Sequence, residues 1–355
     1  MCVPSNLPET DHLIYIPGDA RMARDIGIDL GTCTVLVFVG GKGVVLREPS
    51  IVVRNNRTRE IIAVGQEAKR MMGRTPTDVS AIRPLKLGVI TDFDVTLVML
   101  KYFLGKSTPG FSIGRPRLLV AIPASITSVE RRAVAQAGRE AGGSRVYLME
   151  EPILAALGAG LEISSPGGHM IVDIGGGTSD IAVLSMNEMV RDISTRVGGD
   201  AFDDAIVRYV RRAFNMVIGE NTAEQAKIAV GSAMPEERKE TEIRGRDLVT
   251  GLPRGIIIDS FTLREAIAEP LGAIRRAVRQ VLDSTPPELL GDIVDRGIVL
   301  TGGGALLDGI DRFLSNETGL AANVVDDPVS CVARGTMKVL EGLSSYENHL
   351  KKISV

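Results

Sequence analysis

The sequence predicts an α/β protein built from two copies of one structural plan. Short apolar segments alternate with segments whose apolar residues recur at helical spacing, which is typical of chains that form strands and helices in turn. The second observation is an internal repeat. Residues 26–32 (IGIDLGT) and 171–178 (IVDIGGGT) each place one aspartate in an apolar strand that glycine and threonine follow. The repeat indicates two domains that face each other.

The first copy follows an extension over residues 1–23, which we expect to be mostly irregular with a candidate edge strand at 13–16. Its predicted elements are strands at 25–30 and 35–39, a turn at 40–43 into an apolar run at 44–53, a strand at 61–65, a helix at 91–104, a buried strand at 117–122, a helix between a capping box at 127–130 and Gly142-Gly143, a strand at 146–149, and a helix at 151–161 with Pro152 in its first turn.

The second copy begins at the second glycine-rich motif. Its predicted elements are strands at 170–174 and 181–186, helices within 200–214 and 221–233, a charged segment at 235–247, a strand at 254–260, a long helix that a second capping box opens at 262–265, and a strand at 297–300 leading into Thr301 and the glycines 302–304. The remainder alternates helix, strand and helix.

Composition excludes several classes of function. The chain has 355 residues, of which 44% are hydrophobic and 24% charged, so it can build two ordinary domains. A net charge of −3 and the absence of tryptophan give no support for nucleic-acid binding. Three isolated cysteines and three scattered histidines indicate neither a disulfide framework nor a metal site, and they favour a reducing cytoplasm. No apolar run is long enough for a membrane span, and no signal peptide is evident.

The glycine-rich turns predict a polyphosphate site. Without side chains, successive backbone N–H groups can approach a phosphate and form an anion-binding nest, to which threonine adds a hydroxyl donor. Ordinary tight hairpins are the alternative. The motif occurs twice, however, and a third glycine triplet follows another apolar strand at 302–304. Neither a Walker-type phosphate loop nor a dinucleotide fingerprint is present.

Asp29 and Asp173 precede the two turns, inside runs of isoleucine, valine and leucine. An unpaired charge is costly there, and a carboxylate repels phosphate unless a cation lies between them. Both acids are therefore candidates to hold the water shell of Mg²⁺, which binds few carboxylates and keeps most of its waters. A solvent-facing strand position is the weaker alternative for each.

With these motifs in place, the sequence resembles the superfamily of actin, heat-shock-chaperone and sugar-kinase ATPases, and most closely the MreB family of bacterial rod-shape-determining actin homologues. The resemblance covers residues 25–342 and rests on the two phosphate motifs and on the segments RPLKLGVITDFDVT, LMEEPILAALGAGL, GGDAFDDAIV, AEQAKIAVGSA, TGLPRG, TPPELL, DRGIVLTGGGALLDGID and DDPVSCVARGTMKVLE. It implies an actin-like fold of two duplicated ribonuclease-H-like domains around a nucleotide cleft. It implies domain I at 24–163 plus 335–355, with a subdomain at about 52–95, and domain II at 164–334, with a subdomain at about 200–262.

The resemblance also implies roles for individual residues. Glu151 would position the attacking water, assisted by Thr178, while Asp29 and Asp173 would organise Mg²⁺ through water. The implied contacts to ATP are Thr32, Cys33, Thr34, Gly176, Gly177 and Thr178 at the β- and γ-phosphates, Glu224 and Lys227 at the ribose and base, and Gly303, Gly304, Ala305 and Leu306 at the adenosine.

Independently of the resemblance, Glu151 begins a predicted helix, where the helix dipole favours an ionised carboxylate able to orient or deprotonate water. Plain helix capping is the alternative for Glu151. Glu224 and Lys227 lie three residues apart on one helix face, and a solvated salt bridge is their alternative.

The chain departs from the family's pattern at two places. It has Cys33-Thr34-Val35 where the family usually has Ala-Asn-Thr, and Ser179-Asp180 where Thr-Glu or Thr-Thr is usual. These changes affect the expected rate of hydrolysis more than nucleotide binding.

Members of the family form double filaments on the inner face of the cell membrane, so the resemblance implies self-association, peripheral membrane binding and cooperation with the cell-wall elongation machinery. The loop at 106–115 is rich in glycine and proline and carries Phe111 and Ile113 between Lys106 and Arg115. It fits an apolar membrane-binding loop with basic neighbours for anionic lipid. Packing of both apolar side chains on the core is an equal alternative.

Three other functions compete with the cytoskeletal ATPase. A chaperone ATPase would need a substrate-binding domain, for which the residues after Gly342 leave no room. A sugar or acetate kinase would need a base and polar groups for a second substrate, and no candidates are evident. A nucleotide-binding scaffold with little hydrolysis stays open because of the departures at Thr34 and Ser179.

Overall fold

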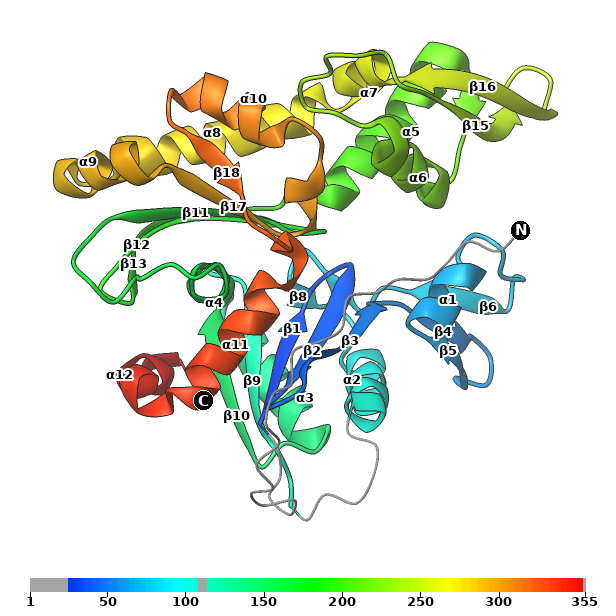
Figure 1. The fold of residues 1–355 in the computed structure, drawn as a ribbon. Coiled ribbons are helices and arrows are strands. Elements are labelled where there is room, and N and C mark those ends of the chain that lie inside the picture. Colours follow the sequence, from blue (N-terminus) through cyan, green and yellow to red (C-terminus); the bar gives the residue numbers. More distant parts are fainter. Residues whose placement is uncertain (1–24, 108–113, 354–355) are drawn as a thin grey trace, which may run out of the picture.

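The computed structural model describes residues 25–107 and 114–353 (Figure 1). The expected irregular extension over 1–23 and its candidate edge strand at 13–16 lie outside these residues. The described chain forms two lobes, each built on a five-stranded sheet. This is the α/β architecture that the alternating pattern predicted.

The two sheets have the same strand order. The first runs β3 (Gly43–Pro49), β2 (Thr34–Val39), β1 (Ile26–Leu30), β9 (Arg117–Ile122), β10 (Arg145–Glu150), and the second runs β13 (Glu188–Thr195), β12 (Ser179–Ser185), β11 (His169–Ile174), β17 (Ile298–Thr301), β18 (Ala322–Val324). In each, three strands pair antiparallel and two more add in parallel beside the first. The predicted duplication is therefore confirmed at the level of topology.

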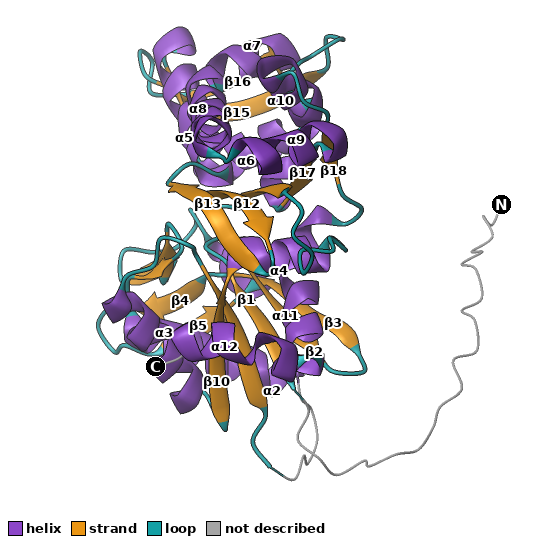
Figure 2. Cartoon of the chain, turned by 90° about the vertical axis from the view of Figure 1, so that its left-hand side faces the viewer, coloured by secondary structure: helices purple, strands orange, loops and turns teal. Residues whose placement is uncertain are grey.

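Helices cover the outer face of each sheet and fill the space between the sheets. The outer helices are α2 (Phe93–Ser107) and α3 (Ser128–Glu140) on the first lobe, and α8 (Ala268–Ser284), α9 (Pro287–Arg296) and α10 (Ile310–Thr318) on the second. Between the sheets lie α4 (Glu151–Gly158) and α11 (Cys331–Glu341), with α12 (Leu343–Ile353) beside them (Figures 1 and 2). One apolar cluster joins both sheets to this middle layer, so the lobes share part of their core.

Glycines allow α4 and α11 to cross at backbone contact. A Cβ on Gly158 of α4 would lie 1.8 Å from the carbonyl oxygen of Cys331, and one on Gly335 of α11 would lie 1.9 Å from that of Leu154. Because backbone on each helix occupies the space that a methyl group would need, only glycine fits at both positions.

Each lobe carries a small outer unit on the same side of the molecule (Figure 1). We call them the first outer unit, formed by β4 (Val52–Asn55), β5 (Ile61–Val64), α1 (Gln66–Met71) and β6 (Val79–Ile82), and the second outer unit, formed by α5 (Gly199–Phe214), β14 (Met216–Val217), α6 (Glu220–Val230), β15 (Glu240–Asp247), β16 (Pro253–Asp259) and α7 (Ser260–Ala266). The short hairpin β7 (Leu85–Lys86) and β8 (Val89–Ile90) follows the first outer unit.

The capping box at 127–130 is confirmed, since Thr127 and Glu130 exchange both expected hydrogen bonds at the start of α3. The prediction of a second capping box at 262–265 is wrong. The N-cap of α7 is Asp259, whose side chain accepts a hydrogen bond from the Thr262 N–H at 2.8 Å. The predicted single long helix is also wrong. Pro270 has no N–H, and its ring crowds the carbonyl four residues earlier, so the chain forms α7 and α8 with a break at Ile267.

The structure adds detail at two further segments. The apolar run at 44–53 divides between β3 and β4, which belong to different sheets. The charged segment at 235–247 contains β15, which pairs with β16. No helix among the described residues is long and apolar enough to cross a membrane.

Candidate functional site

A cavity of about 490 Å³ lies between the lobes and their outer units. The β1–β2 turn (Gly31 to Thr34) and the β11–β12 turn (Gly175 to Thr178) line it from opposite lobes, and α6 and the turn before η1 (Gly303–Leu306) complete its walls. Its volume is in the usual range for small-molecule sites. The duplicated glycine-rich turns thus meet at one cavity, as the sequence repeat predicted.

The two turns touch each other at glycine. A Cβ on Gly176 would lie 2.3 Å from the Cys33 Sγ, and one on Gly177 would lie 2.8 Å from the Thr32 Oγ1. The Thr32 hydroxyl accepts a hydrogen bond from the Gly88 N–H at 2.9 Å, which leaves its proton free to donate into the cavity. The contact between the lobes therefore requires glycine at positions 176 and 177, whether or not a ligand also contacts them.

The third glycine turn lies against the second motif. Gly302 has a φ of 82°, and a Cβ there would lie 2.4 Å from the Asp173 Oδ1. Gly303, Gly304 and Leu306 line the cavity, whereas Ala305 is buried in the core of the second lobe. Of the four residues implied for the adenosine turn, three thus face the cavity.

Four carboxyl groups gather here, of which Asp29, Glu151 and Asp173 line the cavity and Asp180 is buried beside them. Burial, and then Asp173, raise the pKa of Asp29 to about 8, and burial, followed by Asp180, raises that of Asp173 to about 7. Burial raises the pKa of Asp180 to about 6, although hydrogen bonds from Ser194, Ala124 N–H and Thr178 oppose the rise. The fourth is Glu151. A cation would relieve this concentration of acidic groups.

Glu151 is the first residue of α4, and it lines the cavity. Burial, followed by Asp180, Asp29 and Asp173, raises its pKa well above the ordinary value. The expectation that the helix dipole favours the ionised form is therefore wrong for the protein alone, because these effects outweigh the dipole. The simple capping alternative is not supported, since no side-chain capping bond forms at this helix start.

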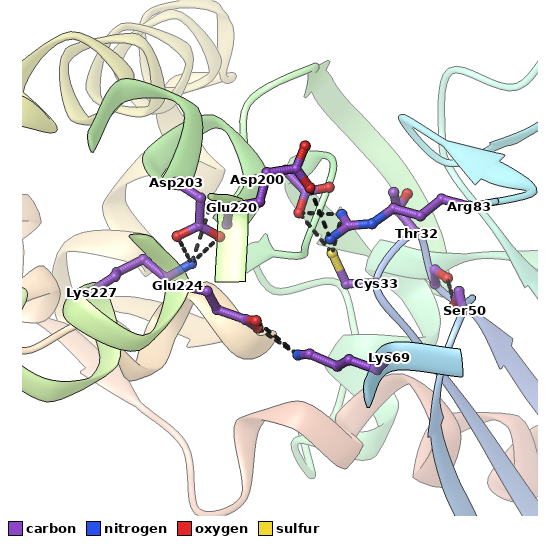
Figure 3. Close-up of polar contacts among 12 residues, drawn as sticks. Thr32, Cys33, Ser50, Lys69, Arg83, Asp200, Asp203, Glu220, Glu224 and Lys227 are labelled. Atoms are coloured by element: carbon purple, nitrogen blue, oxygen red, sulfur yellow. Dashed lines mark hydrogen bonds and ion pairs between the residues drawn. The ribbon is translucent and has the colours of Figure 1, made fainter. Parts of the chain in front are cut away.

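Glu224 and Lys227 both line the cavity from α6, but each has another ion-pair partner (Figure 3). Glu224 Oε2 lies 2.8 Å from Lys69 Nζ, and Lys227 Nζ lies 2.9 Å from Asp203 Oδ1 and 3.1 Å from the Gly199 carbonyl oxygen. The alternative of a salt bridge between Glu224 and Lys227 is therefore not what the structure shows.

Sequence reasoning missed several charged residues at or beside the cavity, and three of them make contacts between the lobes. Arg83 Nη1 lies 2.9 Å from Asp200 Oδ1, which also accepts a hydrogen bond from the Cys33 thiol at 3.0 Å. Lys69 and Arg83 come from the first lobe and Asp200 from the second (Figure 3). Asp200 belongs to the GGD segment of the resemblance, whereas the positions of Lys69 and Arg83 carry no signal of their own.

The structure brings nearly all predicted site residues together. Those that line the cavity are Asp29, Thr32, Cys33, Thr34, Glu151, Asp173, Gly176, Gly177, Thr178, Glu224, Lys227, Gly303, Gly304 and Leu306. Ala305 does not line it. Phe111 and Ile113, predicted for the membrane loop, lie outside the described residues.

Two sheets of identical order with paired glycine-rich turns at a shared cavity define a protein of the actin-like class. Comparison with known proteins identifies the family within this class. The chain matches the MreB/Mbl protein family over residues 23–348, and it belongs to that family.

Its relatives cover almost the whole chain. It is 51% identical over 322 residues to the cell shape-determining protein Mbl of Bacillus subtilis (strain 168), covering 90% of this chain and 97% of Mbl. It is 49% identical over 334 residues to the cell shape-determining protein MreB of Escherichia coli (strain K12), covering 92% and 96%. The crystal structure of MreB5 of Spiroplasma citri bound to ADP superimposes with a TM-score of 0.87 at 38% identity, covering 92% of this chain and 98% of MreB5.

Proposed function

We propose that this chain is a cytoskeletal ATPase that forms actin-like filaments on the inner face of the cell membrane and organises cell-wall synthesis for rod shape. The observation that carries the proposal is the meeting of both glycine-rich turns and three carboxyl groups, Asp29, Glu151 and Asp173, at one cavity between the lobes. The ADP-bound relative MreB5 has the same fold. We also propose the domain division at 24–163 plus 335–355 and 164–334.

The two turns would hold the β- and γ-phosphates of ATP from opposite lobes. Cys33, Thr34, Gly176 and Gly177 line the cavity, and their successive backbone amides would form an anion-binding nest. The hydroxyls of Thr32 and Thr178 would add two donors.

The carboxyl groups fit a magnesium site. Mg²⁺ prefers carboxylate and water oxygens, and Asp29 and Asp173 carry raised pKa values that a nearby cation would lower. No group of three such side chains among residues 25–107 and 114–353 is arranged to hold a metal directly, so we propose that Asp29 and Asp173 act through water. When bound, Mg²⁺ would neutralise phosphate charge during transfer.

Glu151 and Thr178 would act on the attacking water. Glu151 is the acid at the start of α4, and Thr178 is buried in the β11–β12 turn. Once the charge of the neighbouring carboxylates is balanced, an ionised Glu151 can accept a proton from a water that Thr178 helps to orient.

The nucleoside would lie towards α6 and the third glycine turn. Glu224 and Lys227 would offer polar contacts to the ribose and base, and Gly303, Gly304 and Leu306, which also line the cavity, would contact the adenosine. Ile228 and Leu306 are exposed apolar side chains at this cavity. A bound base would shield both from water, which stabilises the complex.

The test is electron microscopy of purified protein with ATP, Mg²⁺ and liposomes, together with a phosphate-release assay. We expect filaments and slow release. Absence of filaments at high concentration with lipid present would contradict the proposal. Filaments without measurable release would instead support the alternative, a nucleotide-binding scaffold with little hydrolysis, for which Cys33 and Asp180 beside the phosphate turns are the specific observation.

Membrane binding is proposed for the loop at 106–115. Co-sedimentation with anionic liposomes is expected to fall in a Phe111→Ser/Ile113→Ser double variant, since burying two apolar side chains contributes most of such binding. Undiminished binding would exclude the loop as the attachment site.

A further inference from the structure

Two ion-pair clusters join the first lobe to residues of the second lobe that line the cavity (Figure 3). We propose that they form a cross-cleft latch that must open before nucleotide can leave, so that Lys69 and Arg83 set the rate of nucleotide exchange. The proposal concerns the regulation of the site and rests on the proposed nucleotide binding.

The first half of the latch is the pair of Lys69 and Glu224. Lys69 lies on α1 of the first outer unit, and Glu224 lies on α6 of the second, 155 residues away in the chain. Lys69 Nζ is 2.9 Å from Glu224 Oε1 and 2.8 Å from Oε2. About a third of each side chain is exposed, so solvent screens the pair only in part. Opening the lobes at this edge must separate the two charges.

The second half is centred on Asp200 at the start of α5. Asp200 Oδ1 accepts hydrogen bonds from Arg83 at 2.9 Å and from the Cys33 thiol at 3.0 Å, and Arg83 lies 3.7 Å from Glu220 as well. Arg83 and Cys33 belong to the first lobe, whereas Asp200 and Glu220 belong to the second. Three contacts, made by Arg83 and Cys33, therefore hold the second outer unit against the first lobe.

The latch lies at the edge of the cavity where the lobes can separate. Away from this edge the lobes are held together, because α4 packs on the second sheet and α11 on the first, and the two helices touch backbone to backbone through Gly158 and Gly335. Relative motion of the lobes must then widen the edge that carries Lys69, Arg83 and their partners.

Cys33 provides a direct reporter of the latch. In the closed structure burial, followed by the charge of Asp200, raises the pKa of the Cys33 thiol to about 12, so the thiol should react slowly with alkylating reagents. Opening removes Asp200 and admits solvent, and both changes favour the reactive thiolate. Cys331 is fully buried in α11 and serves as the internal reference.

The first experiment measures release of a fluorescent ADP analogue, chased with excess ATP, from the full-length protein. Each of Lys69→Ala and Arg83→Ala should speed release by about twofold to fivefold, and the double variant by about tenfold, as expected for partly exposed ion pairs. The control is Arg244→Ala, which removes the same charge but breaks a pair within β15. Release from a folded double variant at the wild-type rate would overturn the proposal.

The second experiment needs no nucleotide, so it stays informative if the proposed function fails. Iodoacetamide labelling of Cys33 is followed by peptide mass spectrometry in the wild type and in Lys69→Ala. Lys69 does not contact Cys33, so faster labelling in the variant reports opening of the cleft. Unchanged labelling, with Cys331 equally protected in both proteins, would overturn the latch. If the protein binds no nucleotide but Cys33 is still labelled faster in Lys69→Ala, the latch stands and only the proposed function is overturned.

Arg83→Ala separates opening from simple electrostatics. Removing a cation beside Cys33 would by itself raise the thiol pKa further, because Arg83 lowers it in the intact protein. Electrostatics alone thus predicts slower labelling, and the latch predicts faster labelling. Slower labelling in this variant would count against the proposal.

Discussion

Asp173 on β11 lies directly opposite Asp180 on β12 in the antiparallel ladder, and both side chains are buried. Two acids face each other where cross-strand pairs usually combine opposite charges or apolar groups. One Asp180 oxygen, Oδ1, has no hydrogen-bond partner. The arrangement is stable only if at least one acid is protonated or a cation is near.

The first prediction concerns Asp180→Asn and the stability of the protein without divalent cations. In the folded state Asp173 has a pKa of about 7 and Asp180 a pKa of about 6, both raised above the ordinary value of 3.8. The folded state thus holds more protons than the unfolded state, and stability is lost as pH rises from about 4 to about 7. We expect Asp180→Asn to reduce this loss and to add about 1–3 kcal/mol at pH 8.

Urea denaturation at pH 5 and pH 8 in the presence of EDTA measures the effect. The matched control is Asp204→Asn, which removes the same charge from an exposed position on α5 and should change stability little at either pH. An Asp180→Asn protein that is less stable than the wild type at pH 8 would contradict the prediction.

The second prediction is that Glu151→Gln separates binding from hydrolysis. The amide has the same shape but cannot accept a proton from water, so phosphate release should fall by about a hundredfold or more. Nucleotide affinity should stay close to that of the wild type. Glu150→Gln is the control, because Glu150 is the neighbouring acid and pairs with His349 at 2.8 Å instead of lining the cavity. Equal release from both variants would remove Glu151 from its proposed role.

The third prediction concerns the contact between the phosphate turns. Gly176→Ala places a methyl group 2.3 Å from the Cys33 Sγ and 2.6 Å from its Cβ, so the turns must move apart and ADP affinity should fall about tenfold. A Gly176→Ala/Cys33→Gly double variant removes both clashing atoms and should recover most of the affinity. Gly219→Ala, where a methyl group meets no atom within 4 Å, is the control. No recovery in the double variant would show that the methyl group blocks the ligand itself.

The fourth prediction is that Gly158→Ala destabilises the whole molecule, by about 1–3 kcal/mol or more. The new methyl group meets the backbone of Cys331 and cannot be relieved by side-chain rotation. Gly291→Ala in α9 is the control, because its methyl group meets nothing within 4 Å and alanine favours the helix. Thermal unfolding of the two variants gives the comparison, and equal midpoints would refute the tight crossing.

Sequence reasoning predicted best what neighbouring residues determine. The two phosphate motifs, the helix start at Thr127 and the buried strand at 117–122 each carry a local pattern, and each is found in the structure. The duplicated strand order followed from the repeat. β15 was missed because its outward-facing side chains are charged, and of its residues only Ile243 and Asp247 are buried. Its hydrogen bonds with β16 hold it in place.

Contacts between distant segments could not be predicted. The partners of Lys69 and Arg83 lie 155 and 117 residues away, and nothing in their local sequence indicates them. The protonation of Glu151 was misjudged for the same reason. Its helix position was evident, but Asp29, Asp173 and Asp180 approach it from three other strands.

The helices that cross at Gly158 and Gly335 hold equivalent places in the duplicated plan, since α4 follows the outermost parallel strand β10 and α11 follows β18. Glu151 begins α4, but the residue that begins α11 is the uncharged Cys331. The proposed water-activating acid is therefore present in only one of two equivalent positions. In the proposed mechanism, a water that attacks the bound phosphate chain therefore meets such an acid only on the side of α4.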